Sequence, residues 1–331
     1  MRLLDRIAQS REPFLVTPGA DSAVMTVRGP SDFSQQIAEC PLRYVLAEDL
    51  TRASGELAFA QGDSVAGCVD LLRIPAPSLW VEWSDAVHHQ VICQCGAVAQ
   101  PDPNATGRQV GVLLRATTDG RSGMARTFWN LADGGEALMS PVETYIDLDE
   151  RFEPAVSAGG MLRGEYVSVT DSRDVGAAGL LQWVRFRFEE SWLKFYQEAA
   201  MDTESQERVA RQCLAAVACD IPFLLSFFLL LSAKGATRPA PVQRDQLNRK
   251  RLTNKRPPLL DHIEVHAALP GHSSGSEHGD GSMTRRPPRL HHVRGHLVRR
   301  DDRVFWRTPH LRGCARQGVV RSRTVCLSFV A

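Results

Sequence analysis

The sequence IPFLLSFFLLLS, residues 221–232, contains twelve uncharged and mostly apolar residues in a row. Apolar side chains occupy every face of a helix drawn through this stretch, so no side is left for solvent. Upstream, Asp202 and Thr203 are typical of a helix start, and Gly235 supplies a stop signal downstream. The stretch therefore predicts a helix that is buried on nearly all sides, at the centre of its domain.

A membrane span is the alternative interpretation of the same stretch. Extending the apolar run back to Leu214 gives about twenty residues, which is the length that a span requires. The extended run contains Asp220 followed by Pro222, however, and a charged residue within a span is costly. We therefore expect a core helix and no membrane partner.

Two strand-like runs lie in the first hundred residues. Residues 79–84, LWVEWS, follow a proline-containing stretch and have the composition of a strand. Residues 88–95, HHQVICQC, follow within hairpin distance and predict a second strand, on which Cys93 and Cys95 share a face. One such pair supplies at most half of a zinc site, so we expect these residues to be buried thiols.

A β-hairpin is predicted over residues 107–131. Two apolar runs are joined there by Asp119 and Gly120, a dipeptide that supplies the positive φ of a tight turn. Further on, PVETYIDLD, residues 141–149, alternates with a period of two and predicts another strand. One face of that strand carries Val142, Thr144, Ile146 and Leu148. The opposite face carries Glu143, Asp147 and Asp149, for which a solvated face is favoured over a cation site.

The period changes near residue 180. Phe188, Trp192 and the Phe195/Tyr196 pair are spaced by three or four residues, which predicts a helix. The eight cysteines of the chain are scattered and do not resemble a disulfide framework. The charged opening residues lack the apolar region of a secretory signal. We therefore expect a reducing, cytoplasmic environment.

Charge divides the chain more sharply than composition does. Residues 1–240 carry 21 Lys+Arg and 31 Asp+Glu, a balance of −10, whereas residues 241–331 carry 18 and 7, a balance of +11. A basic stretch connects the two parts, and GHSSGSEHGDGS, residues 271–282, has too few apolar side chains to form a core. The predicted fold class is α+β, with an acidic mixed domain at 1–235, a basic flexible connector at 236–284 and a small module at 285–331.

The C-terminal module, residues 285–331, predicts an antiparallel β-meander. Its three strands are expected at 290–299, 303–309 and 319–329, with turns between them. The module holds twelve arginines and two aspartates in 47 residues. Such crowded arginines repel one another, and a polyanion such as nucleic acid relieves the repulsion. The residues predicted to bind nucleic acid, either DNA or RNA, are Arg289, Arg294, Arg299, Arg307, Arg312, Arg321, Arg323 and the stacking side chain Trp306.

Other functions of the module stay open. It could dock on the acidic domain, which would neutralise the arginines internally, or serve as a structural or protein-interaction component. His292, His296 and His310 beside arginines are the side chains that a metal-independent ribonuclease needs. The same three histidines with Cys314 have finger-like spacing for zinc, but zinc fingers ordinarily take two cysteines first. Nucleotide-binding and nucleophile-elbow motifs are absent from the sequence, so no cofactor is predicted.

Several segments also carry a resemblance. The segments HHVRGHLVRR, FWRTPHLRG and VRSRTV, with PFLLSFFLLLSAKG and PPLLDHIEV before them, resemble uncharacterised proteins encoded in phages and prophages of GC-rich bacteria. The resemblance covers roughly the last 120 residues. It implies a mobile-element accessory protein made in the bacterial cytoplasm, and it carries no enzymatic activity with it.

Overall fold

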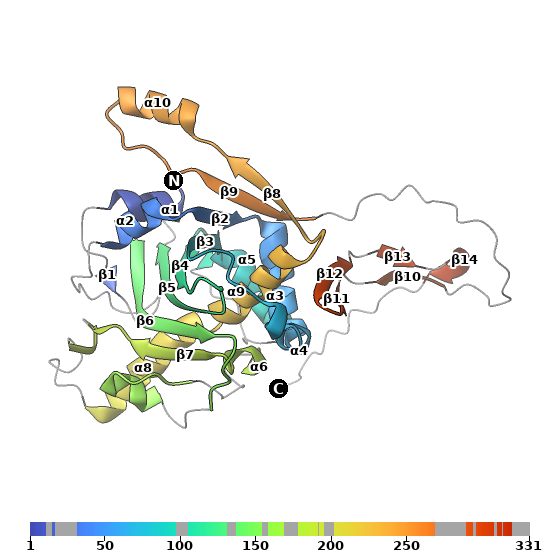
Figure 1. The fold of residues 1–331 in the computed structure, drawn as a ribbon, viewed down its shortest axis with the longest axis horizontal. Helices are drawn as coiled ribbons and strands as arrows, with labels where there is room; N and C mark the ends of the chain where they lie inside the picture. Colours follow the sequence, from blue (N-terminus) through green and yellow to red (C-terminus); the bar gives the residue numbers. More distant parts are fainter. Residues whose placement is uncertain are drawn as a thin grey trace.

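The computed structural model describes residues 1–10, 15–16, 32–96, 105–130, 137–153, 158–168, 178–190, 192–194, 202–268, 289–293, 296–307, 310–312 and 314–319. Its centre is a mixed sheet of nine strands, in the order β1-β6-β5-β4-β3-β2-β9-β8, with β7 paired to β6 (Figure 1). The pairs β1–β6, β3–β2 and β2–β9 are parallel, and the other pairs are antiparallel. Helices cover both faces of this sheet, so the predicted mixed fold with a buried helix is confirmed.

The strands and helices have the following bounds. The strands of the large sheet are β1 Leu15–Val16, β2 Leu42–Leu46, β3 Ser78–Ser84, β4 Gln109–Ala116, β5 Ser122–Asn130, β6 Ala137–Asp147, β7 Val184–Phe188, β8 Thr237–Val242 and β9 His262–Ala267. The helices are α1 Leu3–Gln9, α2 Asp32–Glu39, α3 Glu48–Ala60, α4 Gly62–Ala66, α5 Asp85–Gln94, α6 Ala178–Leu181, α8 Thr203–Ala218, α9 Asp220–Ser232 and α10 Asp245–Thr253, with short 3-10 turns at Val69–Leu71 and Ala158–Arg163.

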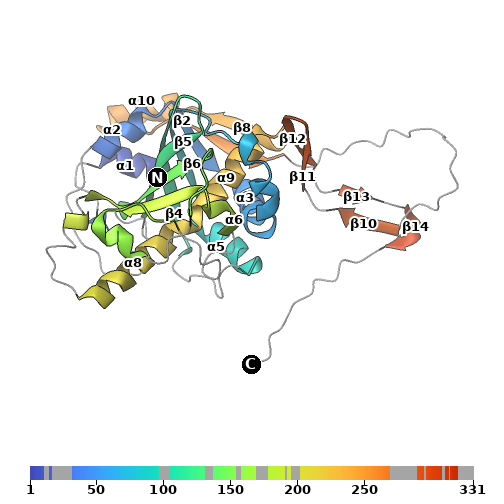
Figure 2. The same cartoon turned by 60° about the horizontal axis from the view of Figure 1, so that its bottom comes forward.

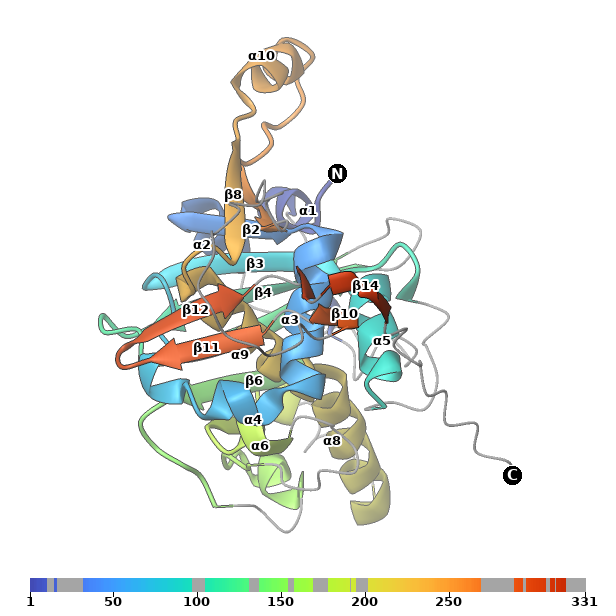
Figure 3. The same ribbon diagram turned by 90° about the vertical axis from the view of Figure 1, so that its right-hand side faces the viewer.

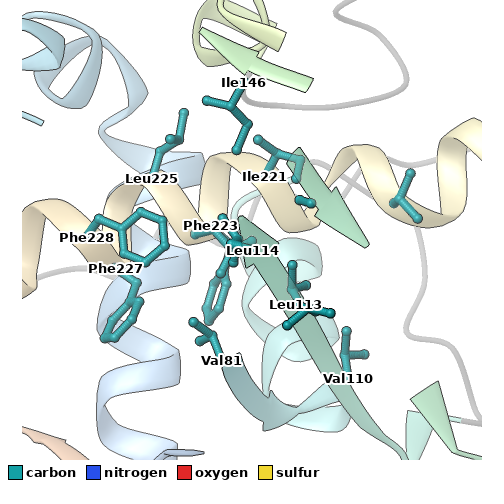
Figure 4. Close-up of a cluster of buried hydrophobic side chains, with 14 of the residues drawn as sticks. Val81, Val110, Leu113, Leu114, Ile146, Ile221, Phe223, Leu225, Phe227 and Phe228 are labelled. Carbon is teal, nitrogen blue, oxygen red and sulfur yellow. The ribbon is translucent and has the colours of Figure 1, made fainter. Parts of the chain in front are cut away.

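Helix α9 is the apolar stretch from which the fold was predicted. Every side chain from Ile221 to Leu230 is buried. Phe223 lies beside Leu114 of β4 (Figure 4), and Phe227 contacts Tyr44 of β2 at 5.8 Å between ring centres. Asp202 caps the preceding helix α8 by accepting a hydrogen bond from the Ser205 backbone N–H. Residues Glu204–Ser232 are long and apolar enough to cross a membrane by length and composition, but 78% of their most apolar window is buried inside the protein. This burial is what a core helix requires.

The two faces of the sheet carry different helices. Trp80 and Phe128 lie on one face, where Phe33 of α2 packs against Phe128 at 5.6 Å between ring centres. Trp83 lies on the opposite face, as strand alternation requires, and contacts Phe223 of α9 at 4.8 Å. Helix α3 covers that second face beside α9 (Figure 3). The large aromatic side chains therefore set both layers of the core.

The predicted hairpin across Asp119 and Gly120 is confirmed by β4 and β5. Gly120 has a φ of +68°, a conformation that glycine adopts without steric cost. Its backbone N–H donates to the Thr117 carbonyl, and the Asp119 carboxylate accepts from the Arg121 backbone N–H. The strand predicted over 79–84 is confirmed as well, since β3 spans Ser78–Ser84.

Two predicted secondary structures are wrong. Residues 88–95 were expected to form a strand, but they lie in helix α5 and its end. Val87 and Val91 are buried four residues apart, which is helical spacing. Residues 184–188, expected to begin a helix, form strand β7, whereas residues 190 and 192–194 just beyond it are helical, as predicted. Val184, Phe186 and Phe188 are all buried, and the aromatic spacing that suggested a helix is outweighed by this alternation.

The expected flexible connector is corrected over residues 237–267. These residues form β8, α10 and β9, and β9 pairs in parallel with β2 through Tyr44 and Ile263. Val265 is completely buried. β8 and β9 thus complete the sheet at one edge, and α10 lies at the far end of the arm that they form (Figure 3). The rest of the predicted connector, 269–284, lies outside the described residues.

The C-terminal module is antiparallel only in part. β11 His296–Arg300 and β12 Arg303–Arg307 form a hairpin, as a turn at Asp301 and Asp302 predicted. β10 Arg289–Val293 belongs to another sheet, between β13 His310–Arg312 and β14 Cys314–Val319, and it is parallel to β14. The single strand predicted at 290–299 is therefore wrong, because alternation alone does not say which sheet a strand joins. The third predicted strand, beyond Val319, lies outside the described residues.

Candidate nucleic-acid interface

The β11–β12 hairpin has two different faces. Its register pairs Leu297 with Trp306 and Arg299 with Val304, so these four residues share one face. Val304 is buried, and Leu297 and Trp306 pack against the core of the large domain. A backbone bridge between Lys234 and Phe305 joins the hairpin edge to the end of α9. The inner face of the hairpin is thus docked beside the large domain (Figure 2).

Arg299 holds this docked face through an ion pair. Its two terminal nitrogens lie 2.8 and 2.6 Å from the carboxylate oxygens of Asp70, and one of them also donates to the Gly67 carbonyl at 2.8 Å. The bidentate contact lowers the pKa of the Asp70 carboxyl, mainly through the hydrogen bond. Arg299 and Trp306, both predicted to contact nucleic acid, therefore face the large domain.

The outer face of the hairpin carries the other arginines. Arg300 is paired with Arg303, Val298 with Phe305, and Arg307 with His296. All three arginines are exposed, and none has an acidic partner among the residues that the structure describes. Arg307 was predicted from the sequence, whereas Arg300 and Arg303 were missed. The register places them on the same face as Val298 and Phe305, away from the docked face, and this is the signal that identifies them.

The other predicted residues are placed only by backbone register or lie outside the described residues. In the second small sheet, His292 is paired with Leu311, His310 with Val293, and Arg289 with Cys314. Arg312 is paired with His291, and His296 lies in the other small sheet. Arg294, Arg321 and Arg323 lie outside the described residues.

These registers bear on the nuclease and zinc hypotheses. No histidine is paired directly with another in β10–β13. Among the described residues, no group of three or more His, Cys, Asp and Glu side chains is arranged to hold a metal ion. Both hypotheses stay predictions, and the pairing of these strands gives them no support.

A buried polar cluster between α5 and α9 is a second candidate. The Nδ1 atom of His88 lies 3.8 Å from a carboxylate oxygen of Asp220, and Arg108 forms an ion pair with Asp85 nearby. The rings of Phe59, Trp83 and Phe223 lie around His88 with centres 4.6 to 6.0 Å away. Burial lowers the pKa of His88 to about 3 and raises that of Asp220.

This cluster does not present a reactive group to solvent. His88 is 2% exposed and Asp220 is 5% exposed, so a substrate has no direct access to either. A histidine with a pKa near 3 is neutral at pH 7, and packing by aromatic rings keeps it so. We assign the cluster a role in stability. The sequence did not reveal it, because His88 was expected on a strand.

The carboxylates of β6 form a third group, and they do not converge on one point. Glu143 is 7% exposed and accepts hydrogen bonds from Arg126 at 2.6 Å, Arg187 at 3.2 Å and the Tyr166 hydroxyl at 3.2 Å. Asp147 accepts from Tyr145, and Asp149 pairs with Arg121. Glu143 therefore does not belong to the solvated face that the alternation predicted. Each carboxylate has its own donors, and Glu143 alone forms an ionic cross-link of β5, β6 and β7.

No family model, curated protein or solved structure matches this chain.

Proposed function

We propose that the chain binds nucleic acid, with the outer face of the β11–β12 hairpin contacting phosphate groups. The supporting observation is the division of that hairpin into two faces. The inner face buries Val304 and neutralises Arg299 against Asp70. The outer face holds Arg300, Arg303 and Arg307 exposed, with Arg300 directly opposite Arg303 on the paired strand.

Mutual repulsion makes such a face unfavourable in the free protein. Arg300 and Arg303 are directly opposite one another, and like charges at that position destabilise a sheet. A phosphate backbone relieves the repulsion, and arginine binds phosphate with two parallel hydrogen bonds. Phe305, on the same face, is available to stack on an unpaired base. Contacts of this kind give little base specificity.

The cellular setting is part of the same proposal. A phage- or prophage-encoded accessory protein in the bacterial cytoplasm would meet nucleic acid at high concentration, and an acidic body with a basic appendage suits that role. Residues 1–240 carry a balance of −10, which repels a polyanion from the large domain and restricts it to the basic surfaces.

The test measures binding of the full-length chain to a labelled 30-base-pair DNA duplex and to a single-stranded RNA of 30 nucleotides, over a series of salt concentrations. The variant R300Q/R303Q/R307Q should flatten the slope of log K against log[salt] on duplex DNA by up to about 2.7, since each neutralised phosphate contributes about 0.9. The matched control R163Q/R185Q/R211Q removes the same charge from arginines already paired with glutamates. It should leave the slope nearly unchanged.

An equal flattening of the salt slope in the variant and its control would show that only net charge matters. It would overturn the assignment of the phosphate contacts to the hairpin. Binding without salt dependence would contradict a phosphate-based interface altogether. Cleavage of the RNA in EDTA, abolished in His296→Ala, would replace simple binding with the nuclease function.

A further inference from the structure

The β8–α10–β9 arm is a second basic surface, formed by residues that were expected to be a flexible connector. Residues 244–256 contain six cations, Arg244, Arg249, Lys250, Arg251, Lys255 and Arg256, and a single acidic residue, Asp245. No residue of α10 is buried. Among the described residues, none of the six cations has a carboxylate within ion-pair distance. The charge of the arm is therefore presented to solvent.

Hydrogen bonds hold the tip of this arm in one arrangement. The side-chain amide of Asn248 donates to the Leu259 carbonyl and accepts from the Leu259 backbone N–H, both at 2.8 Å. The Arg251 Nε atom donates to the Pro257 carbonyl, and the Arg256 backbone N–H donates to the Arg251 carbonyl, also at 2.8 Å. Helix α10 is thus clamped to the segment that returns to β9. Its outward cations need little further ordering to bind a ligand.

Lys255 adds a second sign that the tip serves charge rather than stability. Its φ is +53°, in the left-handed region where glycine or asparagine commonly ends a helix. A side chain there costs about 1 kcal/mol relative to glycine. The helix dipole explains a preference for cations in the last turn of α10, where Lys250 and Arg251 lie, but Lys255 and Arg256 lie beyond it.

The exposed apolar residues argue against a membrane as the occupant. Leu247 is 41% exposed and Leu252 is 60% exposed. They are five residues apart, so they lie about 140° apart around the helix. An interfacial membrane helix needs a continuous apolar face, which this spacing does not give. Exposed cations without such a face are the pattern of a surface that binds phosphates.

We propose that the β8–α10–β9 arm is a second phosphate-binding surface, which takes the backbone of the same class of nucleic acid. The inference rests on the proposed function, but it uses different residues in a different part of the molecule (Figures 1 and 3). The chain then holds one polyanion at two points, or two segments of it at once. Two weak contacts joined by a rigid body bind more tightly than either alone.

The experiment uses the full-length chain and the same duplex and RNA. The variant R249Q/K250Q/K255Q/R256Q leaves Asn248 and Arg251 in place, so the clamped geometry is kept. Its affinity for the duplex near 0.1 M salt should fall at least tenfold, and the salt slope should flatten by up to about 3.6, four times 0.9. The matched control R163Q/R185Q/K194Q/R211Q removes four cations that are paired with glutamates, and it should bind like the wild type.

The single variant Lys255→Gly separates binding from folding. Removing the side chain at positive φ should raise the melting temperature. Loss of one cation should flatten the slope of log K against log[salt] by about 0.9. Unfolding cannot explain weaker binding by a variant that is more stable than the wild type. Unchanged binding in both arm variants would overturn the inference.

The outcomes also distinguish this inference from the proposed function. Loss of binding in the hairpin variant alone supports the proposed function and overturns the arm as a phosphate surface. Loss of binding in the arm variant alone supports the arm as a phosphate-binding surface and shows that the hairpin is not part of the interface. An arm variant that keeps nucleic-acid affinity but loses binding to anionic lipid vesicles, or changes its mass in light scattering, identifies a membrane or a second copy and overturns the inference.

Discussion

Glu82 is a fully buried carboxylate that joins strand β3 to helix α1. Its two oxygens accept hydrogen bonds from the backbone N–H groups of Leu3 and Leu4, both at 3.0 Å, and one also accepts from the Trp80 indole at 3.2 Å. The first N–H groups of a helix have no partner within it, and Glu82 supplies one for two of them. Burial nevertheless raises the pKa of Glu82, so its ionised form depends on these donors.

We expect Glu82→Ala to lower the free energy of unfolding by about 2 to 4 kcal/mol, because it leaves three buried donors without an acceptor. Glu82→Gln should lose less, since an amide oxygen still accepts from a backbone N–H. Urea denaturation measures both changes. The control Glu165→Ala, at an exposed residue, should leave the urea midpoint nearly unchanged. A Glu82→Ala protein as stable as the wild type would contradict the role of this carboxylate.

His88 predicts a loss of stability in acid. Its folded pKa of about 3 lies below the value of 6.5 for a free histidine, so the unfolded chain binds more protons between these pH values. The contribution of neutral His88 to the free energy of unfolding is complete above pH 6.5. It falls by about 1.4 kcal/mol per pH unit as the pH drops towards 3. Asp220, which faces His88, has its pKa raised by burial and acts in the opposite sense.

The comparison with His88→Leu isolates the histidine from the aspartate. As the pH falls from 7 to 4.5, the unfolding free energy of the wild type should decrease relative to that of the variant. Chemical denaturation at several pH values measures the difference. A constant difference between wild type and His88→Leu across this range would contradict the prediction.

At the scale of elements, the docked hairpin is held by the surface ion pair between Arg299 and Asp70. Asp70→Asn removes the charge that neutralises Arg299, so the hairpin gains one uncompensated cation. If the hairpin contacts phosphate, duplex affinity should rise and the salt slope should steepen by up to about 0.9. Asp63→Asn changes the charge of an exposed residue in the adjacent helix α4 and is the control. Weaker binding by Asp70→Asn would show that the ion pair positions the hairpin for its ligand.

Local sequence signals predicted some elements and not others. Helix α9 was predicted because its uniform apolar run allows only a buried helix, and the β4–β5 hairpin because Asp119-Gly120 selects one turn. Strand β8 was missed because Pro239 and Pro241 argue against a strand interior. They are tolerated there because β8 is the last strand of the sheet and one of its edges is unpaired in the part of the chain that the structure describes.

The site was less predictable than the fold for a related reason. Alternation placed arginines on two faces of the C-terminal strands, but the choice of the docked face depends on Asp70, which lies 229 residues from Arg299. The buried cluster around His88 likewise brings together residues from α5 and α9 that have no signal in common. Contacts that are distant in sequence decide these sites, and no local pattern encodes them.

At the scale of the whole molecule, the hairpin and the arm are two basic surfaces on one folded body. We expect both to contribute to nucleic-acid binding, and changes in one should not affect the stability of the other. The combined hairpin and arm variant should flatten the salt slope by the sum of the separate changes, because the residues share no contacts. Thermal unfolding of the combined variant should match that of the two separate variants, which controls for damage to the fold. A combined change equal to the larger single change would mean that the two surfaces do not bind one duplex at the same time.

The pairing of β2 with β9 has a consequence for how the chain is made. Tyr44 leaves the ribosome well before its partner Ile263, which is 219 residues later. At translation speeds of about 5 to 20 residues per second, the edge of β2 waits roughly 11 to 44 s for that partner. During this time an unpaired strand edge is open to other nascent chains. Chaperone demand during synthesis should therefore end only when the second half of the basic arm has been translated.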